Sequence, residues 1–356
     1  MNSTAPADSP PPVAWPDAAR HALFDAWFAG IAARHGLRAS TLCPASSDAS
    51  FRRYLRVQGD TCSFIVMDAP PAHEDVRPFV HVAEMMLGAG LNAPQIVEQS
   101  PEHGFLLLGD LGTRLYLGEL QAAVSTGDTA TIAQLMQDAT AALITWQLQV
   151  DASSLPPYDD ALLRREMQLF PDWCVEREYG QTWTDEQRAQ WQAVTDLLVK
   201  SALAQPTVAV HRDYMPRNLM VCAANPGILD FQDAVRGPIS YDVASLLRDA
   251  FISWDEEQEI DWAVRCWQQA KKAGLPVPED FGDFWRQLEW MGLQRHLKVL
   301  GIFCRLKHRD GKPRYSTDLP RFFRYAHHVA SRYNGLGPLA RLLEPLMGET
   351  RTDVFF

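Results

Sequence analysis

Five polar residues within one stretch of twenty have the types and spacing that phosphoryl transfer requires. His211, Arg212 and Asp213 are consecutive, Asn218 follows five residues after Asp213, and Asp230 follows twelve residues after Asn218. Asp213 can accept the proton of an attacking hydroxyl group, or at least orient that hydroxyl. Asn218 and Asp230 offer the hard oxygen ligands that magnesium prefers. Phosphoryl transfer demands positioning and charge neutralisation more than covalent help, so these are the residue types that the reaction needs.

The residues between Asn218 and Asp230 have the pattern of a β-hairpin. Residues 219–222 form a short apolar run, residues 225–227 read Asn-Pro-Gly, which is typical of a turn, and residues 228–231 form a second apolar run. Such a hairpin would carry Asn218 and Asp230 back toward each other, as two ligands of one metal ion require.

Each of these residues taken singly has an ordinary structural explanation. A histidine such as His211 is more often packed in a core than catalytic, and Asp213, Asn218 and Asp230 could be a turn former, a cap and a surface charge. Their joint occurrence with the hairpin is much harder to explain by chance, because the spacing is that of a kinase catalytic loop followed by a magnesium-binding Asp. We therefore interpret the stretch as catalytic, with His211 and Arg212 in supporting positions.

The sequence HRDYMPRNLMV, followed by GILDFQDAVRGPISYDVASLLRD, resembles the aminoglycoside phosphotransferase family, a branch of the protein-kinase-like fold. In detail it is most similar to the bacterial N-acetylmuramate/N-acetylglucosamine kinases of peptidoglycan recycling, which phosphorylate an amino sugar at its anomeric hydroxyl. The resemblance is strongest from Val208 to Asp249. It extends more weakly upstream to about Ser46.

The resemblance implies a kinase that uses ATP and Mg²⁺, with Asp213 as the catalytic residue and Asn218 and Asp230 as the magnesium ligands. It also implies that Asp242 braces the catalytic loop through hydrogen bonds to the loop backbone. Asp242 lies in the first turn of a helix predicted over residues 241–251, so stabilisation of the helix dipole explains its position equally well.

The length and composition fit a globular protein of two lobes. The 356 residues exceed one comfortable domain, and a hydrophobic content of 47% supports a sizeable core. We expect the α+β, protein-kinase-like fold that the resemblance implies. A flexible arm over residues 1–12 would precede a small antiparallel-sheet lobe for the nucleotide over 13–110, and a larger helical lobe over 111–356 would hold the catalytic loop and the acceptor site.

The charge and the cysteines favour a cytoplasmic protein with small-molecule partners. A net charge of −11 argues against binding to nucleic acid or to an anionic membrane, but not against ATP, since magnesium and a few arginines can neutralise the phosphates. The N-terminus has neither a basic start nor an apolar run, and no apolar stretch is long enough to span a bilayer. The six cysteines are scattered without a C-x-x-C pair, as is typical of reduced thiols in the cytoplasm.

The first lobe lacks the lysine that protein kinases place on their third strand. Strands are predicted near residues 40–45, 51–57 and 63–67, and Met67 or Asp68 occupies the expected position of that lysine. The chain contains no lysine at all before residue 200, so a cation for the phosphates in this lobe must be an arginine.

Arg52 and Arg53 on the second strand are the candidates, and strand alternation sends them to opposite faces. Arg53 shares its face with apolar residues, so it would need an anionic partner there. We favour Arg53 as the phosphate cation and Glu84, on a helix predicted over residues 75–88, as its partner. The alternatives are that both arginines are solvated and that Glu84 is a solvent-exposed helix charge.

Two further parts of the first lobe are candidates for nucleotide binding. Residues 46–50 read SSDAS, at the place where a kinase fold covers the ATP phosphates, and Ser47 and its neighbours could cradle phosphate with hydroxyl groups and backbone amides. An ordinary hairpin turn explains this glycine-free loop equally well. The apolar run ending in Leu107 and Leu108 resembles the hinge between lobes, where backbone groups could pair with adenine, although a core strand would look the same.

The acceptor site is expected where a predicted helix over residues 161–178 is interrupted by Pro171, because this region borders the acceptor cleft in the resembled family. Glu166, Asp172 and Trp173 are the candidates, since carboxylates bind sugar hydroxyls and an indole can stack on a sugar face. A tryptophan such as Trp173 is nevertheless more often a core residue.

Two alternatives remain open. One is a kinase of the same fold that phosphorylates another hydroxyl compound, such as an aminoglycoside. The other is a non-catalytic nucleotide-binding module, which the missing lysine and the glycine-free loop favour. The presence of all of Asp213, Asn218 and Asp230 opposes this second alternative, because a module without chemistry has no need of all three.

Overall fold

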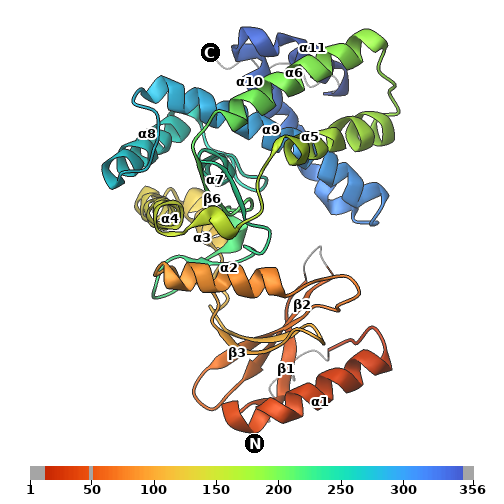
Figure 1. Cartoon of the computed structure of the whole chain (residues 1–356), viewed down its shortest axis with the longest axis vertical. Coiled ribbons are helices and arrows are strands. Elements are labelled where there is room, and N and C mark those ends of the chain that lie inside the picture. The colour runs from red at the N-terminus through yellow and green to blue at the C-terminus, as the bar shows by residue number, and fades with distance from the viewer. Residues whose placement is uncertain (1–12, 48–50, 348–356) are drawn as a thin grey trace, which may run out of the picture. The chain divides into compact units, whose positions relative to one another are not determined.

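The chain forms two compact units, which we call the first and second unit (Figure 1). The first unit contains the chain up to Arg114 and the segment Met220–Asp233, and the second contains Leu115–Leu219 and the chain from Ala234 onward. This computed structural model describes residues 13–47 and 51–347, so the arm predicted at residues 1–12 lies outside the described residues.

The lobe boundary predicted at residue 110 lies close to this division, but the prediction placed the hairpin that carries Asp230 in the wrong unit. The backbone N–H of Ile228 donates to the carbonyl oxygen of Asn92 at 2.8 Å, and the Asn92 side chain donates to the carbonyl oxygen of Ala224 at 2.6 Å. These bonds attach the hairpin to the first unit, although it follows the catalytic loop in sequence.

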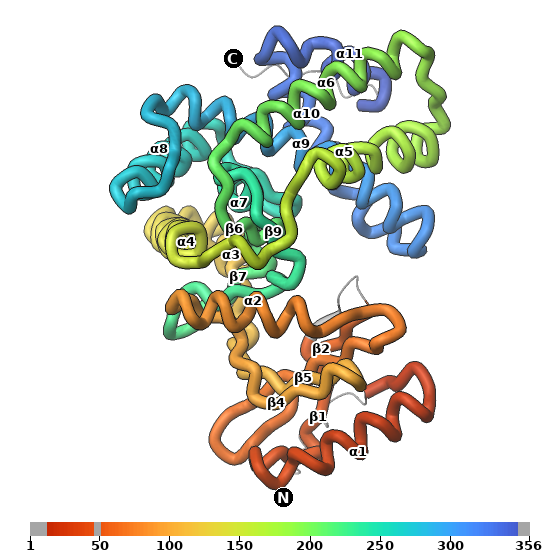
Figure 2. Tube along the Cα trace, viewed as in Figure 1, coloured from red at the N-terminus to blue at the C-terminus, as the bar shows by residue number. Residues whose placement is uncertain are grey.

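The first unit is built on one antiparallel sheet of five strands in the order β1-β2-β3-β5-β4. Figure 2 labels β1, β2, β4 and β5 of this sheet. The strands are β1 (Arg38–Ser47), β2 (Arg53–Gln58), β3 (Ser63–Asp68), β4 (Ile96–Ser100) and β5 (Phe105–Gly109), and two helices accompany them, α1 (Ala18–His35) and α2 (Arg77–Gly88). The short strands β7 (Leu219–Met220) and β8 (Gly227–Ile228) pair in the hairpin.

Helix α1 forms because its sequence supplies both a cap at each end and one apolar stripe. The Asp17 carboxylate accepts the N–H of Arg20 at 2.7 Å, and Gly36 ends the helix with a left-handed φ of 60°. Phe24 and Phe28 belong to the stripe that packs on the face of the sheet formed by residues such as Leu55 and Leu107. This packing is the core of the first unit.

The second unit is mostly helical. Its α-helices are α3 (Tyr116–Thr126), α4 (Thr129–Gln149), α5 (Asp160–Leu169), α6 (Asp185–Leu203), α7 (Tyr241–Leu247), α8 (Glu256–Ala273), α9 (Phe281–His308), α10 (Leu319–Arg332) and α11 (Gly337–Leu343). Strands β6 (Thr207–Val210) and β9 (Val235–Pro238) pair antiparallel. Short helices are η1 (Ala152–Ser154), η3 (Pro216–Asn218), η4 (Pro313–Asp318), η5 (Asn334–Leu336) and η6 (Glu344–Leu346).

Helix α9 is the central helix of the second unit and packs against α5, α6, α7 and α10. It is buried over most of its length, as expected for a helix that other helices surround. Gly301 permits its closest approach to α5, because a Cβ atom at this position would lie 2.3 Å from the carbonyl carbon of Leu169.

The helix predicted over residues 161–178 changes its hydrogen-bond pattern near Pro171, where an interruption is expected, but the chain stays helical. It continues as η2 (Phe170–Glu178), a π-helix in which the N–H of Tyr179 reaches the carbonyl oxygen of Cys174 at 3.1 Å. Pro171 has no N–H to donate, so the helical register can change at this position. The helix predicted over residues 241–251 ends earlier than expected, at Leu247.

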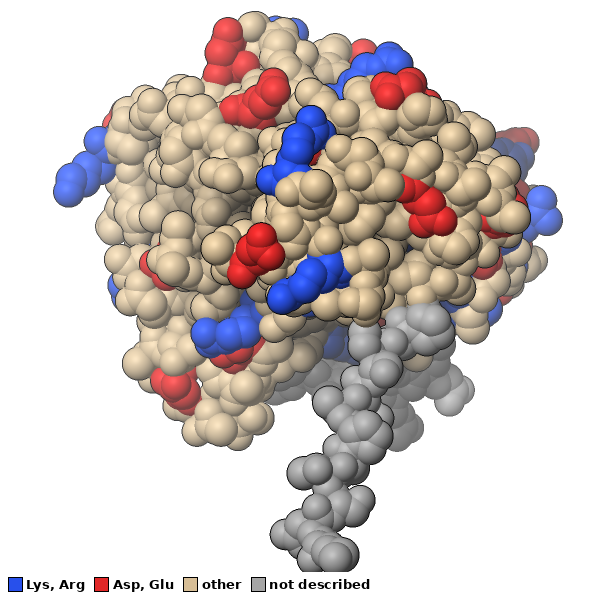
Figure 3. Space-filling model, turned by 90° about the horizontal axis from the view of Figure 1, so that it is seen from below, with Lys and Arg blue, Asp and Glu red and all other residues tan. Residues whose placement is uncertain are grey.

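Acidic and basic side chains are interspersed among uncharged ones on the face shown in Figure 3. Of the helices in the described part of the chain, none combines the length and the apolar character that crossing a membrane requires.

Candidate active site

The catalytic loop of the second unit follows β6 and is held by one buried carboxylate. Asp242, on the first turn of α7, accepts the N–H of His211 at 2.7 Å with Oδ2 and the N–H of Arg212 at 2.9 Å with Oδ1. The His211 ring is fully buried, and its Nδ1 accepts the N–H of Asp213 at 3.2 Å. The resemblance implied this bracing by Asp242, and the geometry gives His211 a structural position.

Asp213 and Asn218 are joined by a hydrogen bond across the loop. The side-chain amide of Asn218 donates to the carbonyl oxygen of Asp213 at 2.9 Å, and the Asn218 N–H donates to the carbonyl oxygen of Met215 at 2.8 Å. Because its nitrogen is directed at the loop backbone, the amide oxygen of Asn218 points the other way. Among the described residues, none donates a hydrogen bond to the half-buried Asp213 carboxylate.

Arg212 and Asp230 are the two described residues other than glycine with a positive φ, at 76° and 62°. Such a backbone conformation costs free energy in a residue with a side chain and is concentrated at functional sites. Arg212 directly precedes Asp213, and Asp230 is the predicted magnesium ligand in the first unit. The Asp230 carboxylate accepts a hydrogen bond from Gln232 at 3.0 Å.

The predicted pair of Arg53 and Glu84 does not form. Arg53 donates instead to Asp68, its cross-strand neighbour on β3, with an Nε–Oδ2 distance of 3.0 Å. Asp68 is fully buried and also binds Arg20 of α1, with an Nε–Oδ1 distance of 2.9 Å. Glu84 is exposed on α2. Arg53 therefore has the anionic partner that its environment requires, and that partner is one of the two residues, Met67 and Asp68, predicted at the position of the kinase lysine.

Arg52, not Arg53, is the arginine that approaches Asp230. Its guanidinium nitrogens lie 3.9 Å from Oδ1 of Asp230 and 3.9 Å from Oε2 of Glu74. The side chain is only 10% exposed. Burial opposes the charge, but Tyr54, Asp230 and Glu74 raise the pKa of Arg52 above its ordinary value, so it remains a cation.

The predicted hinge residues lie inside the sheet. Leu107 and Leu108 are buried on β5, which pairs with β3 on one side and with β4 on the other. Both residues therefore have strand neighbours on either side, which leaves their backbone groups less available to adenine than those of an edge strand. Ser47 ends β1 opposite Arg53, and residues 48–50 of the predicted phosphate loop lie outside the described residues.

Two of the predicted acceptor residues lie at the surface and one is buried. Asp172 is exposed and accepts a hydrogen bond from Gln168 at 2.7 Å, and Trp173 is half-buried. Glu166, by contrast, is only 5% exposed. Both of its carboxylate oxygens bind protein side chains, Oε1 that of Arg212 and Oε2 that of Tyr158. The Glu166 carboxylate is therefore occupied by protein side chains.

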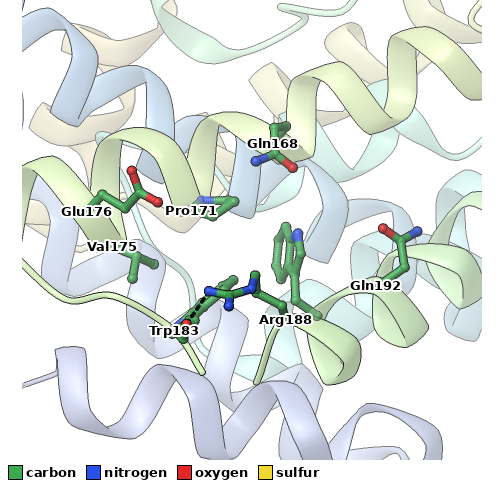
Figure 4. A pocket seen from close by; sticks show the side chains of 8 residues that line it. Gln168, Pro171, Val175, Glu176, Trp183, Arg188 and Gln192 are labelled. Carbon is green, nitrogen blue, oxygen red and sulfur yellow. Dashed lines mark hydrogen bonds between the residues drawn. The ribbon is translucent and has the colours of Figure 1, made fainter. Parts of the chain in front are cut away.

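A pocket of about 220 Å³ lies beside this region, between η2 and α6 (Figure 4). Gln168, Val175 and Glu176 line one side, and Arg188, which donates to the carbonyl oxygen of Trp183, lines the other. Side chains two positions apart on a helix point in nearly opposite directions. The pocket, which Gln168 lines, therefore lies on the opposite side of α5 from Glu166 and its contact with the catalytic loop.

Sequence reasoning missed Lys298 and Tyr158, which both contact Glu166. Lys298 interrupts the otherwise apolar run of residues 297–304 in α9, and a lysine in such a run was a usable signal. Nothing comparable marks Tyr158, because a tyrosine in a loop is ordinary.

The described residues contain one other group with metal-ligand types, formed by Glu256, Glu289 and His328. The guanidinium of Arg332 donates to all three, at 3.0 Å to Glu289 and 2.8 Å to His328. An arginine already supplies the positive charge there, so we assign no metal to this group.

Asp242 is expected to give the activity a pH dependence near neutrality. Burial raises its pKa to about 7, against the two backbone N–H groups, which favour the carboxylate. Both oxygens accept these N–H bonds, so protonation would replace an acceptor by a donor and loosen the loop. We expect kcat/KM to fall as the pH drops through about 7, and this limb to disappear in Asp242→Asn.

Stability should change in the opposite direction. The folded pKa of Asp242 lies above the unfolded value of about 3.9, so the ionised carboxylate costs stability, and the unfolding temperature should decline from about pH 4 to pH 7 and then level off. The difference between wild type and Asp242→Asn isolates this contribution. A limb in kcat/KM that persists unchanged in the variant would assign the titration to another group.

Comparisons with known proteins identify the family of this chain. Residues 41–281 match the profile of the phosphotransferase enzyme family. The chain is 53% identical over 314 residues to the N-acetylmuramate/N-acetylglucosamine kinase of Pseudomonas putida, an alignment covering 88% of this chain and 90% of that protein. It is 46% identical over 313 residues to the protein of the same name from Neisseria meningitidis, covering 88% and 92%.

Solved structures show the same fold at low sequence identity. The choline kinase LicA from Streptococcus pneumoniae matches with a TM-score of 0.61 and 12% identity, covering 87% of this chain and 99% of that chain. The ADP-bound aminoglycoside phosphotransferase APH(2'')-Ib matches with a TM-score of 0.55 and 14% identity, covering 87% and 97%. The expected protein-kinase-like α+β fold is confirmed. By its profile match and by its identity to the kinases from Pseudomonas putida and Neisseria meningitidis, the chain belongs to the phosphotransferase enzyme family.

Proposed function

We propose that this protein is an ATP- and magnesium-dependent kinase that phosphorylates the anomeric hydroxyl of N-acetylmuramate or N-acetylglucosamine, giving the sugar 1-phosphate. The observation that carries the proposal is the built catalytic loop. Asp213 is held through the His211 ring and the Asn218 amide, and Asp242 fixes the loop backbone. The identity to kinases named for these two sugars supports the acceptor. A cytoplasmic location and a role in peptidoglycan recycling would follow.

The chemical roles follow from the residue types. Asp213 would accept the proton of the anomeric hydroxyl, and its half-buried carboxylate has no competing donor among the described residues. Asn218 and Asp230 would hold magnesium with an amide oxygen and a carboxylate oxygen, the donors that this ion prefers. Magnesium bound with ATP would supply the charge neutralisation on the phosphates. Asp172 and Trp173 remain candidates for the acceptor sugar.

Arg52 is our candidate for the phosphate cation in place of the missing lysine. It approaches both Asp230 and Glu74. The lysine of a protein kinase likewise pairs with a Glu and acts beside the magnesium-binding Asp. A guanidinium also suits phosphate, because its planar fork can donate two parallel hydrogen bonds. Arg20 and Arg53, by contrast, both bind Asp68.

Arg52→Gln is expected to lower kcat/KM for ATP by about 10²–10³-fold, because one preorganised cation is lost from the transferring phosphate. Arg52→Lys should retain part of the activity. The measurement is steady-state kinetics with ATP as the varied substrate.

The matched control is Arg53→Gln, one position further along the chain. It should lower the unfolding temperature, because it leaves Asp68 with one partner fewer, and should change kcat/KM for ATP only a few-fold. If Arg53→Gln shows the large kinetic loss and Arg52→Gln does not, the phosphate cation is Arg53.

The reaction itself is tested by phosphorus NMR of the protein with magnesium, ATP and each of three acceptors, N-acetylmuramate, N-acetylglucosamine and kanamycin. We expect an anomeric sugar phosphate together with a matching amount of ADP. Kanamycin phosphate alone would keep the catalytic residues and replace the acceptor. ATP binding without any product would favour the non-catalytic module.

A further inference from the structure

A buried polar cluster lies behind the catalytic loop, and Glu166 of α5 is its centre. Its carboxylate binds the guanidinium of Arg212, the ammonium of Lys298 at 3.0 Å and the hydroxyl of Tyr158. Gln294 completes the cluster, donating to the Tyr158 hydroxyl at 3.1 Å and to Glu166 at 3.4 Å. The cluster therefore connects α5 and α9 to the residue that precedes Asp213.

The charges in this cluster are deeply buried. The side chains of Glu166, Lys298 and Arg212 are 7%, 9% and 18% exposed. Burial opposes the charged form of Glu166, but Lys298 and Arg212 outweigh it and lower the pKa of the carboxyl to about 2. Buried ion pairs often contribute no net stability compared with apolar residues of similar size. The cluster therefore calls for an explanation other than stability.

The backbone of Arg212 supplies that explanation. Its φ of 76° is a strained conformation that persists only where the surroundings enforce it. Asp242 holds the N–H of Arg212 at 2.9 Å, and Glu166 holds the far end of its side chain. Arg212 is thus fixed at both ends, and the direction in which the chain enters Asp213 depends on both contacts.

We propose that Glu166 is a positioning residue of the catalytic loop, which acts by anchoring Arg212, and that Lys298 provides the second positive charge that holds the Glu166 carboxylate in place. This inference rests on the proposed role of Asp213 as the residue that accepts the hydroxyl proton. The fixed carboxylate of Glu166 on α5 keeps the loop in its strained conformation before any substrate binds.

The test compares kcat, KM and unfolding temperature in Glu166→Gln and in the charge-balanced variant Glu166→Gln with Lys298→Met. The second variant is needed because Glu166→Gln alone leaves two buried cations without their carboxylate and lowers stability. The matched control is Glu178→Gln. Glu178 also links this helical segment to α9, through Lys307 at 2.6 Å, but its ion-pair partners Lys307 and His308 both lie on α9 and not in the catalytic loop.

We expect both Glu166 variants to lower kcat by about 10–100-fold, since small misplacement of a catalytic group has effects of this size. KM for ATP should stay within about threefold, and Glu178→Gln should keep the wild-type kcat. In a double-mutant cycle with Arg212→Met, adding Glu166→Gln should cause little further loss of kcat, because both substitutions break the same contact.

A folded charge-balanced variant with wild-type kcat would overturn the proposal, because a purely structural role would change the unfolding temperature and not the turnover of the folded enzyme. Additive losses of kcat in the double-mutant cycle would also overturn it. Failure of the proposed function is recognised separately, by the absence of any phosphorylated sugar from the wild-type protein, and failure of the role of Asp213 by a high turnover of Asp213→Asn. If Asp213→Asn is inactive and the Glu166 variants are fully active, only the positioning role is contradicted.

Discussion

Asp213→Asn is expected to lower kcat by about 10²–10⁴-fold, because the substitution removes the carboxylate that accepts the hydroxyl proton. ATP binding should change little, because the shape of the side chain is retained. The Asn side chain is nearly isosteric, and the N–H of residue 213 would still donate to the His211 ring. Turnover is measured by ADP release with N-acetylmuramate, and ATP binding by the shift in unfolding temperature.

The control for this prediction is Asp196→Asn on α6, an exposed acid of the same unit that pairs with Arg164. It should leave kcat unchanged, because exposed pairs contribute little. Near-normal turnover of Asp213→Asn would remove this residue from the mechanism, and a lost response to ATP in the binding assay would show that the variant had disturbed the nucleotide site instead.

Asp230→Asn is expected to lower kcat/KM for ATP by about 10²–10³-fold and to raise the magnesium concentration needed for half-maximal activity by at least about tenfold. The carboxylate is the stronger of the two proposed magnesium ligands, since it carries a full charge. Asn is among the residues that adopt a left-handed backbone most readily, so the φ of 62° at this position should be retained.

The comparison for this second prediction is Asp233→Asn, an exposed acid in the same loop. Its magnesium dependence should match wild type. Partial recovery of Asp230→Asn at high magnesium would support weakened metal binding as the cause. An unchanged magnesium dependence with reduced turnover would mean that Asp230 acts in another way, for example by holding Arg52.

The catalytic loop could be predicted from sequence because its parts are close together in the chain. Asp213 and Asn218 are five residues apart, and the bond between them follows from a single short turn with η3. The bracing by Asp242 was implied only by the resemblance. The chain between this residue and the loop gives no indication of which backbone groups its carboxylate would reach.

The arginine of the first unit could not be chosen from sequence. Strand alternation separates Arg52 from Arg53, but it does not determine which side chain meets a carboxylate from elsewhere in the chain. Asp68 binds Arg53 across the sheet and Arg20 from a helix 48 residues away. These pairs depend on the register of β2 with β3 and on the docking of α1.

The sequence by itself determined the order of most elements and the identity of the loop residues, because apolar periodicity, caps and turns act over a few residues, and its resemblance to the aminoglycoside phosphotransferases implied the fold class. Only the tertiary structure decided which buried charges pair. Glu166 was expected to bind substrate and instead binds Arg212 and Lys298, from segments 46 and 132 residues along the chain. A buried carboxylate must be neutralised by whichever cations the packing brings to it, and local sequence does not specify that packing.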